Sequence, residues 1–111
     1  MAIDFNKAKD FIALCEMDFF SGAFSESVIR ADLENRKAMD RLSTMGSSGM
    51  QTNELRNKKN YYIQDFDNCL SGITQVLDWA RNNHWDTMFI SRCERCKEQV
   101  NKLHDIVRNF H

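Results

Sequence analysis

The sequence has no proline and only four glycines among its 111 residues. All-β sandwiches and barrels with many tight turns depend on these residues, so such folds are excluded. The charges nearly cancel, with 15 Lys and Arg against 16 Asp and Glu, which argues against a strongly basic nucleic-acid-binding protein. No apolar run approaches the roughly 18 residues of a membrane-spanning helix, so we expect no such span.

What is present is an ordinary globular composition. Hydrophobic residues make up 42% of the chain and charged residues 28%, a balance that supports a core and argues against disorder. At this length we expect a single domain over residues 1–111. The first residues contain neither the basic region nor the apolar stretch of a secretory signal, so we expect a cytoplasmic protein with reduced cysteines.

Apolar side chains recur at spacings of three and four along most of the chain, which predicts four amphipathic helices. We expect them at about residues 4–20, 25–45, 53–83 and 86–110. Asp4 and Asp86 are placed to cap the first and the fourth helix. The stretch Gly46-Ser47-Ser48-Gly49 is typical of a linker and separates the second helix from the third.

Short turns after the first and third helices favour antiparallel neighbours. The sequence therefore predicts an all-α fold, an antiparallel up-down four-helix bundle made of two helical hairpins joined by the Gly/Ser loop. The helix lengths do not match, because at ~1.5 Å per residue the third helix could reach ~45 Å and the first only ~25 Å. The longer helices therefore have a part, near Tyr62 and Phe66, that the first helix does not reach. Either a second copy or a partner covers this part, or the second helix and the loop fold over it. Self-association thus remains open.

Each predicted helix has one apolar stripe that we expect to face the core. The clearest stripe, on the fourth helix, repeats at spacings of four and three from Phe89 to Phe110, as knobs-into-holes packing requires. The stripe expected for the second helix consists of Val28, Ala31, Ala38, Leu42 and Met45, widened by Ile29 and Met39 and interrupted by Asn35.

The most suggestive chemical motif is the Cys-X-X-Cys pair of Cys93 and Cys96. Such a pair can form half of a zinc or redox site. Both residues fall on the core stripe of their helix, where buried cysteine behaves as a small hydrophobic residue, and we favour this interpretation. The alternative is a thiol-based metal-binding or redox-sensing bundle, in which Cys15, Cys69, Cys93 and Cys96 hold zinc or oxidise in pairs.

No catalytic motif is found in the sequence. It contains no His-Glu-X-X-His, no Glu-X-X-His and no glycine-rich phosphate-binding fingerprint. The cluster of basic and tyrosine residues at 56–62 is better explained as a solvated helix start than as a nucleic-acid site. We therefore predict that the protein is not an enzyme and needs no cofactor.

The functional hypothesis rests on aromatic residues at the tips of the two predicted hairpins. Phe20 and Phe24 lie at the first tip, and Trp79, Trp85 and Met88 lie at the second. In an up-down bundle both tips share one end, and exposed aromatic and Met side chains are enriched in protein-binding surfaces. The alternative is that these side chains pack on one another and cap the core.

We expect a small non-enzymatic protein–protein interaction module, such as an adaptor, inhibitor, immunity protein or export chaperone, that buries these five residues in another protein. The segment Leu77-Asp-Trp-Ala-Arg-Asn-Asn-His-Trp-Asp86 resembles the hairpin turn of flagellar export chaperones, which are small helical proteins that hold partner helices. The likeness covers about ten residues of the second predicted hairpin. It implies binding of a partner helix.

Overall fold

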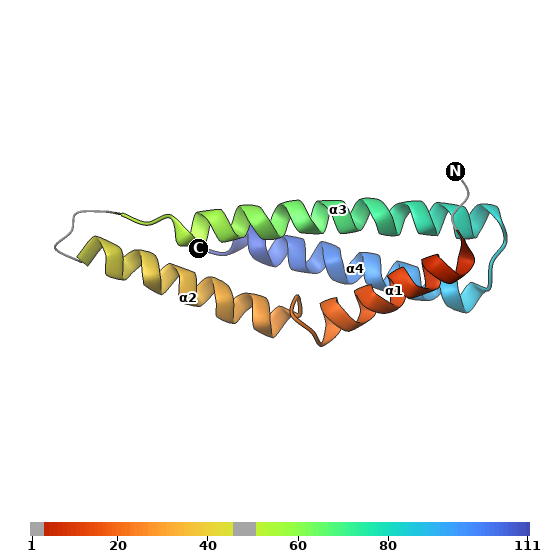
Figure 1. The fold of residues 1–111 in the computed structure, drawn as a ribbon, viewed down its shortest axis with the longest axis horizontal. Coiled ribbons are helices and arrows are strands. Elements are labelled where there is room, and N and C mark those ends of the chain that lie inside the picture. Colours follow the sequence, from red (N-terminus) through yellow and green to blue (C-terminus); the bar gives the residue numbers. More distant parts are fainter. Residues whose placement is uncertain (1–3, 46–50) are drawn as a thin grey trace.

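The computed structural model describes residues 4–45 and 51–111. Within them the chain forms four helices: α1 (Phe5–Phe20), α2 (Glu26–Met45), α3 (Glu54–Asn82) and α4 (Thr87–Asn109). The predicted all-α, up-down helical bundle is confirmed (Figure 1). The Gly/Ser stretch predicted as a linker at 46–49 lies outside the described residues.

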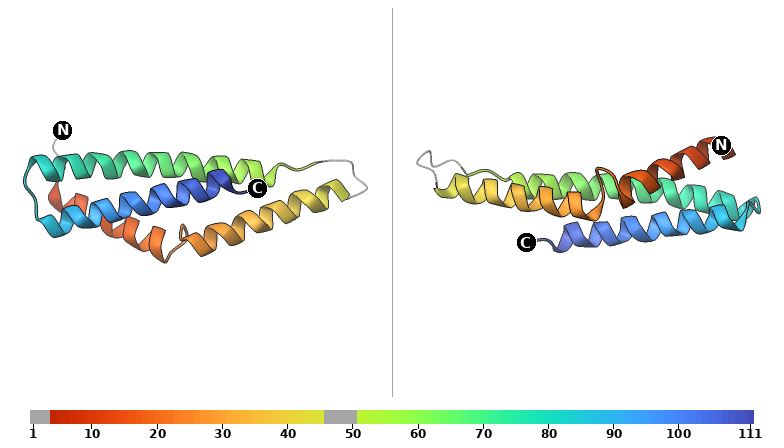
Figure 2. Two further views of the ribbon diagram at one scale, coloured as in Figure 1. Left: turned by 180° about the vertical axis from the view of Figure 1, so that it is seen from behind. Right: turned by 90° about the horizontal axis from the view of Figure 1, so that it is seen from below.

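The α3–α4 hairpin forms most of the length of the molecule, α1 and α2 lie along it one after the other, and the C-terminal end of α2 projects beyond it (Figure 1). α1 packs mainly against α4, whereas α2 packs mainly against α3. The bend at residues 21–25 that joins α1 to α2 lies near the middle of the hairpin, as two further views also show (Figure 2). The molecule is therefore elongated, with extents of 62 × 25 × 20 Å.

This arrangement explains how helices of unequal length form one bundle. The half of α3 that α1 does not reach is covered by α2, whose Asp32 accepts a hydrogen bond from the hydroxyl of Tyr62 at 2.7 Å. Of the two explanations for the length mismatch, the folding of the second helix over the third is the one that the structure shows. Self-association stays a prediction.

The helix ends follow from local chemistry. Asp4 and Asp86 accept hydrogen bonds from main-chain N–H groups two residues ahead, at 2.8 and 3.1 Å, and so cap α1 and α4 as predicted. α1 ends at Phe20, and the chain turns at Gly22. A Cβ atom at position 22 would lie 2.9 Å from the carbonyl oxygen of Met17, so this turn requires a residue without a side chain.

The core runs the length of the bundle and combines side chains from all four helices. Its buried members are Ala8, Ile12, Cys15, Phe19, Ile29, Leu33, Tyr62, Phe66, Ile73, Val76, Leu77, Ala80, Phe89, Cys93, Cys96, Val100, Leu103 and Val107. All of these residues except Ile29 and Leu33 lie on α1, α3 and α4. In the middle of α3, Gly72 lets α1 approach closely, because a Cβ there would lie 3.0 Å from the ring of Phe11.

Candidate protein-interaction surface

The apolar stripe predicted for α2 faces away from the core. Leu42 and Met45 are 67% and 75% exposed, and Val28 is exposed as well. The buried apolar residues of this helix are Leu33 and Ile29, both 0% exposed, and only Ile29 belongs to the predicted stripe. The prediction that the 28–45 stripe joins the core is therefore wrong for its other members, and α2 carries two apolar faces, of which the larger is open to solvent.

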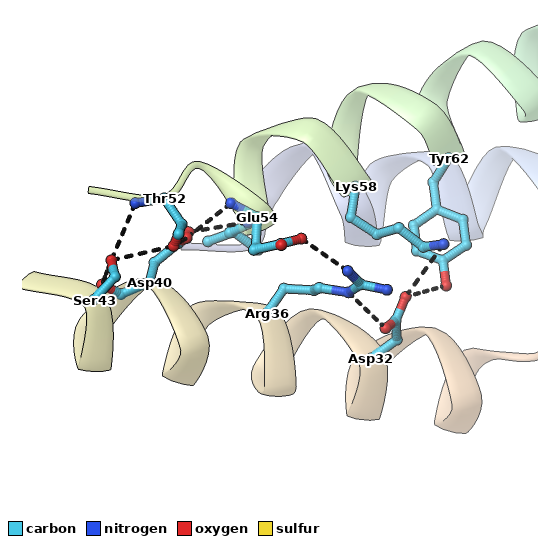
Figure 3. A network of polar contacts seen from close by, with 9 residues as sticks. Asp32, Arg36, Asp40, Ser43, Thr52, Glu54, Lys58 and Tyr62 are labelled. Carbon is cyan, nitrogen blue, oxygen red and sulfur yellow. Dashed lines mark hydrogen bonds and ion pairs between the residues drawn. The ribbon is translucent and has the colours of Figure 1, made fainter. Parts of the chain in front are cut away.

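A polar network between α2 and α3 completes the inner face of α2 (Figure 3). The carboxylate of Asp32 accepts hydrogen bonds from the Tyr62 hydroxyl at 2.7 Å and from Nε of Arg36 at 3.2 Å. The same guanidinium donates through Nη1 to Glu54 on α3 at 2.8 Å. These contacts give the polar groups on the inner face of α2 hydrogen-bond partners. This part of the face can therefore pack against α3 without an apolar residue.

Asp40 extends this network to the N-terminus of α3. Its carboxylate accepts hydrogen bonds from the main-chain N–H groups of Glu54 and Leu55, at 2.7 and 3.0 Å, and from the hydroxyl of Thr52 at 2.6 Å. Asn53, at the capping position itself, makes no side-chain cap. A residue of α2 thus satisfies the free N–H groups at the start of α3.

The pKa values of these groups reflect the network. Burial acts to raise the pKa of Asp32, but the hydrogen bonds from Tyr62 and Arg36 and the positive charge of Lys58 outweigh it and lower the pKa below its usual value. Hydrogen bonds from Thr52 and from the start of α3 lower the pKa of Asp40. Both carboxylates are therefore ionised at neutral pH and act as acceptors.

The inner contacts fix the rotation of α2 about its own axis. Asp32, Arg36 and Asp40 recur every fourth residue, so they lie in one row that faces α3. The opposite face is therefore held outward. We call it the outer stripe and define it by six exposed residues that alternate spacings of three and four: Val28, Ala31, Asn35, Ala38, Leu42 and Met45.

Charged residues border the outer stripe along one edge. Glu34 and Arg41 are both exposed, and neither takes part in an ion pair within residues 4–45 and 51–111. Further around α2, Glu26 pairs with Lys102 of α4 at 3.2 Å, which marks the side that faces the bundle. The outer stripe thus has the composition of a helix-packing seam with charges beside it.

The five residues predicted to bind a partner lie in two separate places. Phe24 sits at the bend halfway along the molecule, with its ring 6.1 Å from that of Tyr62. Trp85 sits at the end that holds the α3–α4 turn, with its ring 4.5 Å from that of Phe5. The expectation that both tips share one end is wrong, because α1 and α2 follow one another and do not fold back as a hairpin.

Most of these five side chains make contacts within the chain. Trp79 packs edge-to-face on Trp85 at 4.6 Å, and Phe20 lies beneath the guanidinium of Arg95 at 4.4 Å. Met88, by contrast, is 73% exposed. The arrangement of the two tryptophans fits the alternative of an end cap for the core, and a role of these residues in binding stays a prediction.

The cysteines occupy the core. Cys15, Cys93 and Cys96 are buried, and Cys69 is partly buried. Burial raises the pKa of Cys15 to about 12 and the pKa values of Cys93 and Cys96 to about 11, so these thiols are protonated at neutral pH. No group of three or more His, Cys, Asp or Glu side chains among the described residues is placed to hold a metal ion. The geometry thus favours core packing over zinc binding.

Comparison of the chain with protein-family models, with curated proteins and with solved structures finds no match. The resemblance of the α3–α4 turn to flagellar export chaperones gains no support from these comparisons. In the part of the chain that the structure describes, no helix combines the length and the hydrophobicity needed to cross a membrane.

Proposed function

We propose that the protein is a small non-enzymatic interaction module, of the adaptor, inhibitor, immunity-protein or export-chaperone kind, that binds an amphipathic helix on the outer stripe of α2. The observation that carries this proposal is that the residues of the outer stripe have the spacing of a helix-packing surface and are exposed to solvent. Alternating spacings of three and four are what a second helix needs to insert its side chains between those of the first. Within residues 4–45 and 51–111, no helix of the same chain fills that role.

The residue types of the outer stripe suit such packing. Ala31 and Ala38 are small and allow a partner helix to approach closely, while Leu42 and Met45 supply apolar area. Met is adaptable in shape and frequent on surfaces that bind helices. The partner is therefore expected to present apolar side chains at helical spacing, with charged residues opposite Glu34 and Arg41.

The structure offers a matched pair of positions for the test. Leu42 lies on the outer stripe and Met88 lies in the first turn of α4, beside the α3–α4 turn, and both are large, apolar and exposed. Replacing either by glutamate places a charge on one surface and leaves the buried core unchanged. The two variants therefore separate the outer stripe from the tip surface predicted from the sequence.

The experiment is affinity purification of the tagged wild type, Leu42→Glu and Met88→Glu from cells that naturally contain the protein, with quantitative mass spectrometry of the co-purified proteins. We expect defined partners that are retained by Met88→Glu and lost from Leu42→Glu. Partners that survive Leu42→Glu but are lost from Met88→Glu and Trp85→Ala would contradict the outer stripe and support the tip surface. Far-UV circular dichroism confirms that each variant is folded.

A further inference from the structure

We infer that the helix bound by the outer stripe is α2 of a second copy of this chain, with the two helices antiparallel. This inference rests on the proposed function, because it uses the same surface and names its occupant. A symmetric pair requires one surface to be complementary to itself. The outer stripe meets that requirement in its side-chain sizes, in its charges and in its accessibility.

The side-chain sizes match in one antiparallel register. A two-fold axis placed midway between positions 35 and 38 sets Ala31 opposite Leu42 of the second copy and Asn35 opposite Ala38. In this register each layer pairs a larger side chain with a smaller one, and the outermost layers pair Val28 with Met45. Large-against-small layers keep the distance between helix axes even along the contact.

The charges match in the same register. Glu34 and Arg41 lie seven residues apart on one edge of the outer stripe, so they share an angular position on the helix. In the antiparallel pair, Glu34 of each copy faces Arg41 of the other, which gives two identical ion pairs. In a parallel pair Glu34 would face Met39 of the second copy, and neither charge would be matched.

The surroundings of α2 leave room for a second copy. The bend between α1 and α2 points away from α3, so α1 slopes back toward the hairpin and does not cover the outer stripe (Figures 1 and 2). The seam extends over about 26 Å, from Val28 to Met45, at ~1.5 Å per residue. A single pair of helices of this length lies at the small end of specific interfaces, so we expect a reversible, concentration-dependent dimer.

The test uses charge reversal in the full-length chain, followed by sedimentation equilibrium. We expect the wild type to dimerise, and Glu34→Arg and Arg41→Glu each to raise the dimer Kd about tenfold or more, because both ion pairs become like-charge contacts. Mixing the two variants restores opposite charges at both contacts, so the mixture forms a heterodimer of near wild-type affinity. The double variant E34R/R41E likewise recovers. Glu98→Arg, an exposed reversal on α4, leaves the Kd unchanged.

The outcomes separate this inference from the proposed function. A wild type that stays monomeric at every concentration, or a mixture of the two variants that stays monomeric, overturns the antiparallel pair. If Leu42→Glu still abolishes co-purification of a different protein in that case, the proposed function stands and its occupant is another chain. If Leu42→Glu changes neither dimerisation nor co-purification, both proposals fail.

Discussion

The rotation of α2 makes a quantitative prediction for two leucines on opposite faces of the same helix. Leu33 is 0% exposed and Leu42 is 67% exposed, and both are to be replaced by alanine. Replacing a fully buried leucine removes its transfer free energy and leaves a cavity, at a cost of about 3 kcal/mol. Leu33 is one of only two buried apolar residues of α2, so little of the helix can rearrange to fill the space.

The cost at Leu42 is far smaller. About a third of this side chain is shielded from water, and full burial of a leucine contributes about 1.5–3 kcal/mol, so its loss costs under about 1 kcal/mol. Alanine also favours helix slightly more than leucine, which offsets part of this cost. We therefore expect Leu33→Ala to lower the free energy of unfolding by at least about 2 kcal/mol more than Leu42→Ala.

The assay is urea unfolding followed by far-UV circular dichroism, with the slope and the midpoint fitted for each variant. The protein concentration is kept below the dimer Kd, because dimerisation through Leu42 would add stability by mass action. Equal costs for the two variants, or a larger cost for Leu42→Ala, would refute the orientation of α2 and with it the outer stripe. Repeating the Leu42→Ala measurement at high concentration gives an independent check on dimerisation.

Three further predictions follow from single contacts. Because folding lowers the pKa of Asp32, its contribution to stability is complete above its unfolded pKa of about 3.9 and is lost as pH falls through the folded value; Asp32→Asn is expected to flatten the acid limb of a stability–pH profile. Gly72→Ala gains helix propensity of about 1 kcal/mol but crowds the ring of Phe11, so urea unfolding shows stabilisation in a Phe11→Ala background and none in the wild type. Cys69 is the least buried thiol, so peptide mass spectrometry after brief labelling with a thiol reagent finds it modified first; rapid labelling of Cys93 would contradict the core assignment.

The sequence predicts α3 and α4 well because each has a single dominant apolar stripe. On α4 the spacing leaves one choice of inner face, and Cys93, Cys96 and Val100 are buried as expected. The caps at Asp4 and Asp86 were also predictable, since each bonds to an N–H only two residues away. A sequence pattern is enough to predict a contact when the two residues lie close together in the sequence.

The orientation of α2 could not be predicted in the same way. Counting apolar residues favours the 28–45 stripe over the pair Ile29 and Leu33, and the larger stripe is the exposed one. What decides the orientation is a set of polar contacts with distant partners, such as Asp32 with Tyr62 and Asp40 with the start of α3. A carboxylate that caps a helix 14 residues further along the chain leaves no local signal in the sequence.

The position of the aromatic tips was missed for a related reason. Short turns after the first and third predicted helices suggest two hairpins side by side, whereas α3 is long enough to lie against α1 and α2 in turn. The bend near Phe24 therefore falls halfway along α3. The sequence identifies which residues lie near the two turns. The distance between the two turns, however, depends on how the helices are placed along one another.

The most direct test of the outer stripe is site-specific photo-cross-linking. A benzophenone amino acid at position 38, in the centre of the stripe, is compared with the same group at position 98 on the exposed face of α4. Illumination of cells that naturally contain the protein is expected to give a discrete adduct from position 38 and none from position 98. The absence of any discrete adduct from position 38, with an adduct formed from position 88 at the α3–α4 turn, would contradict the assignment of binding to α2.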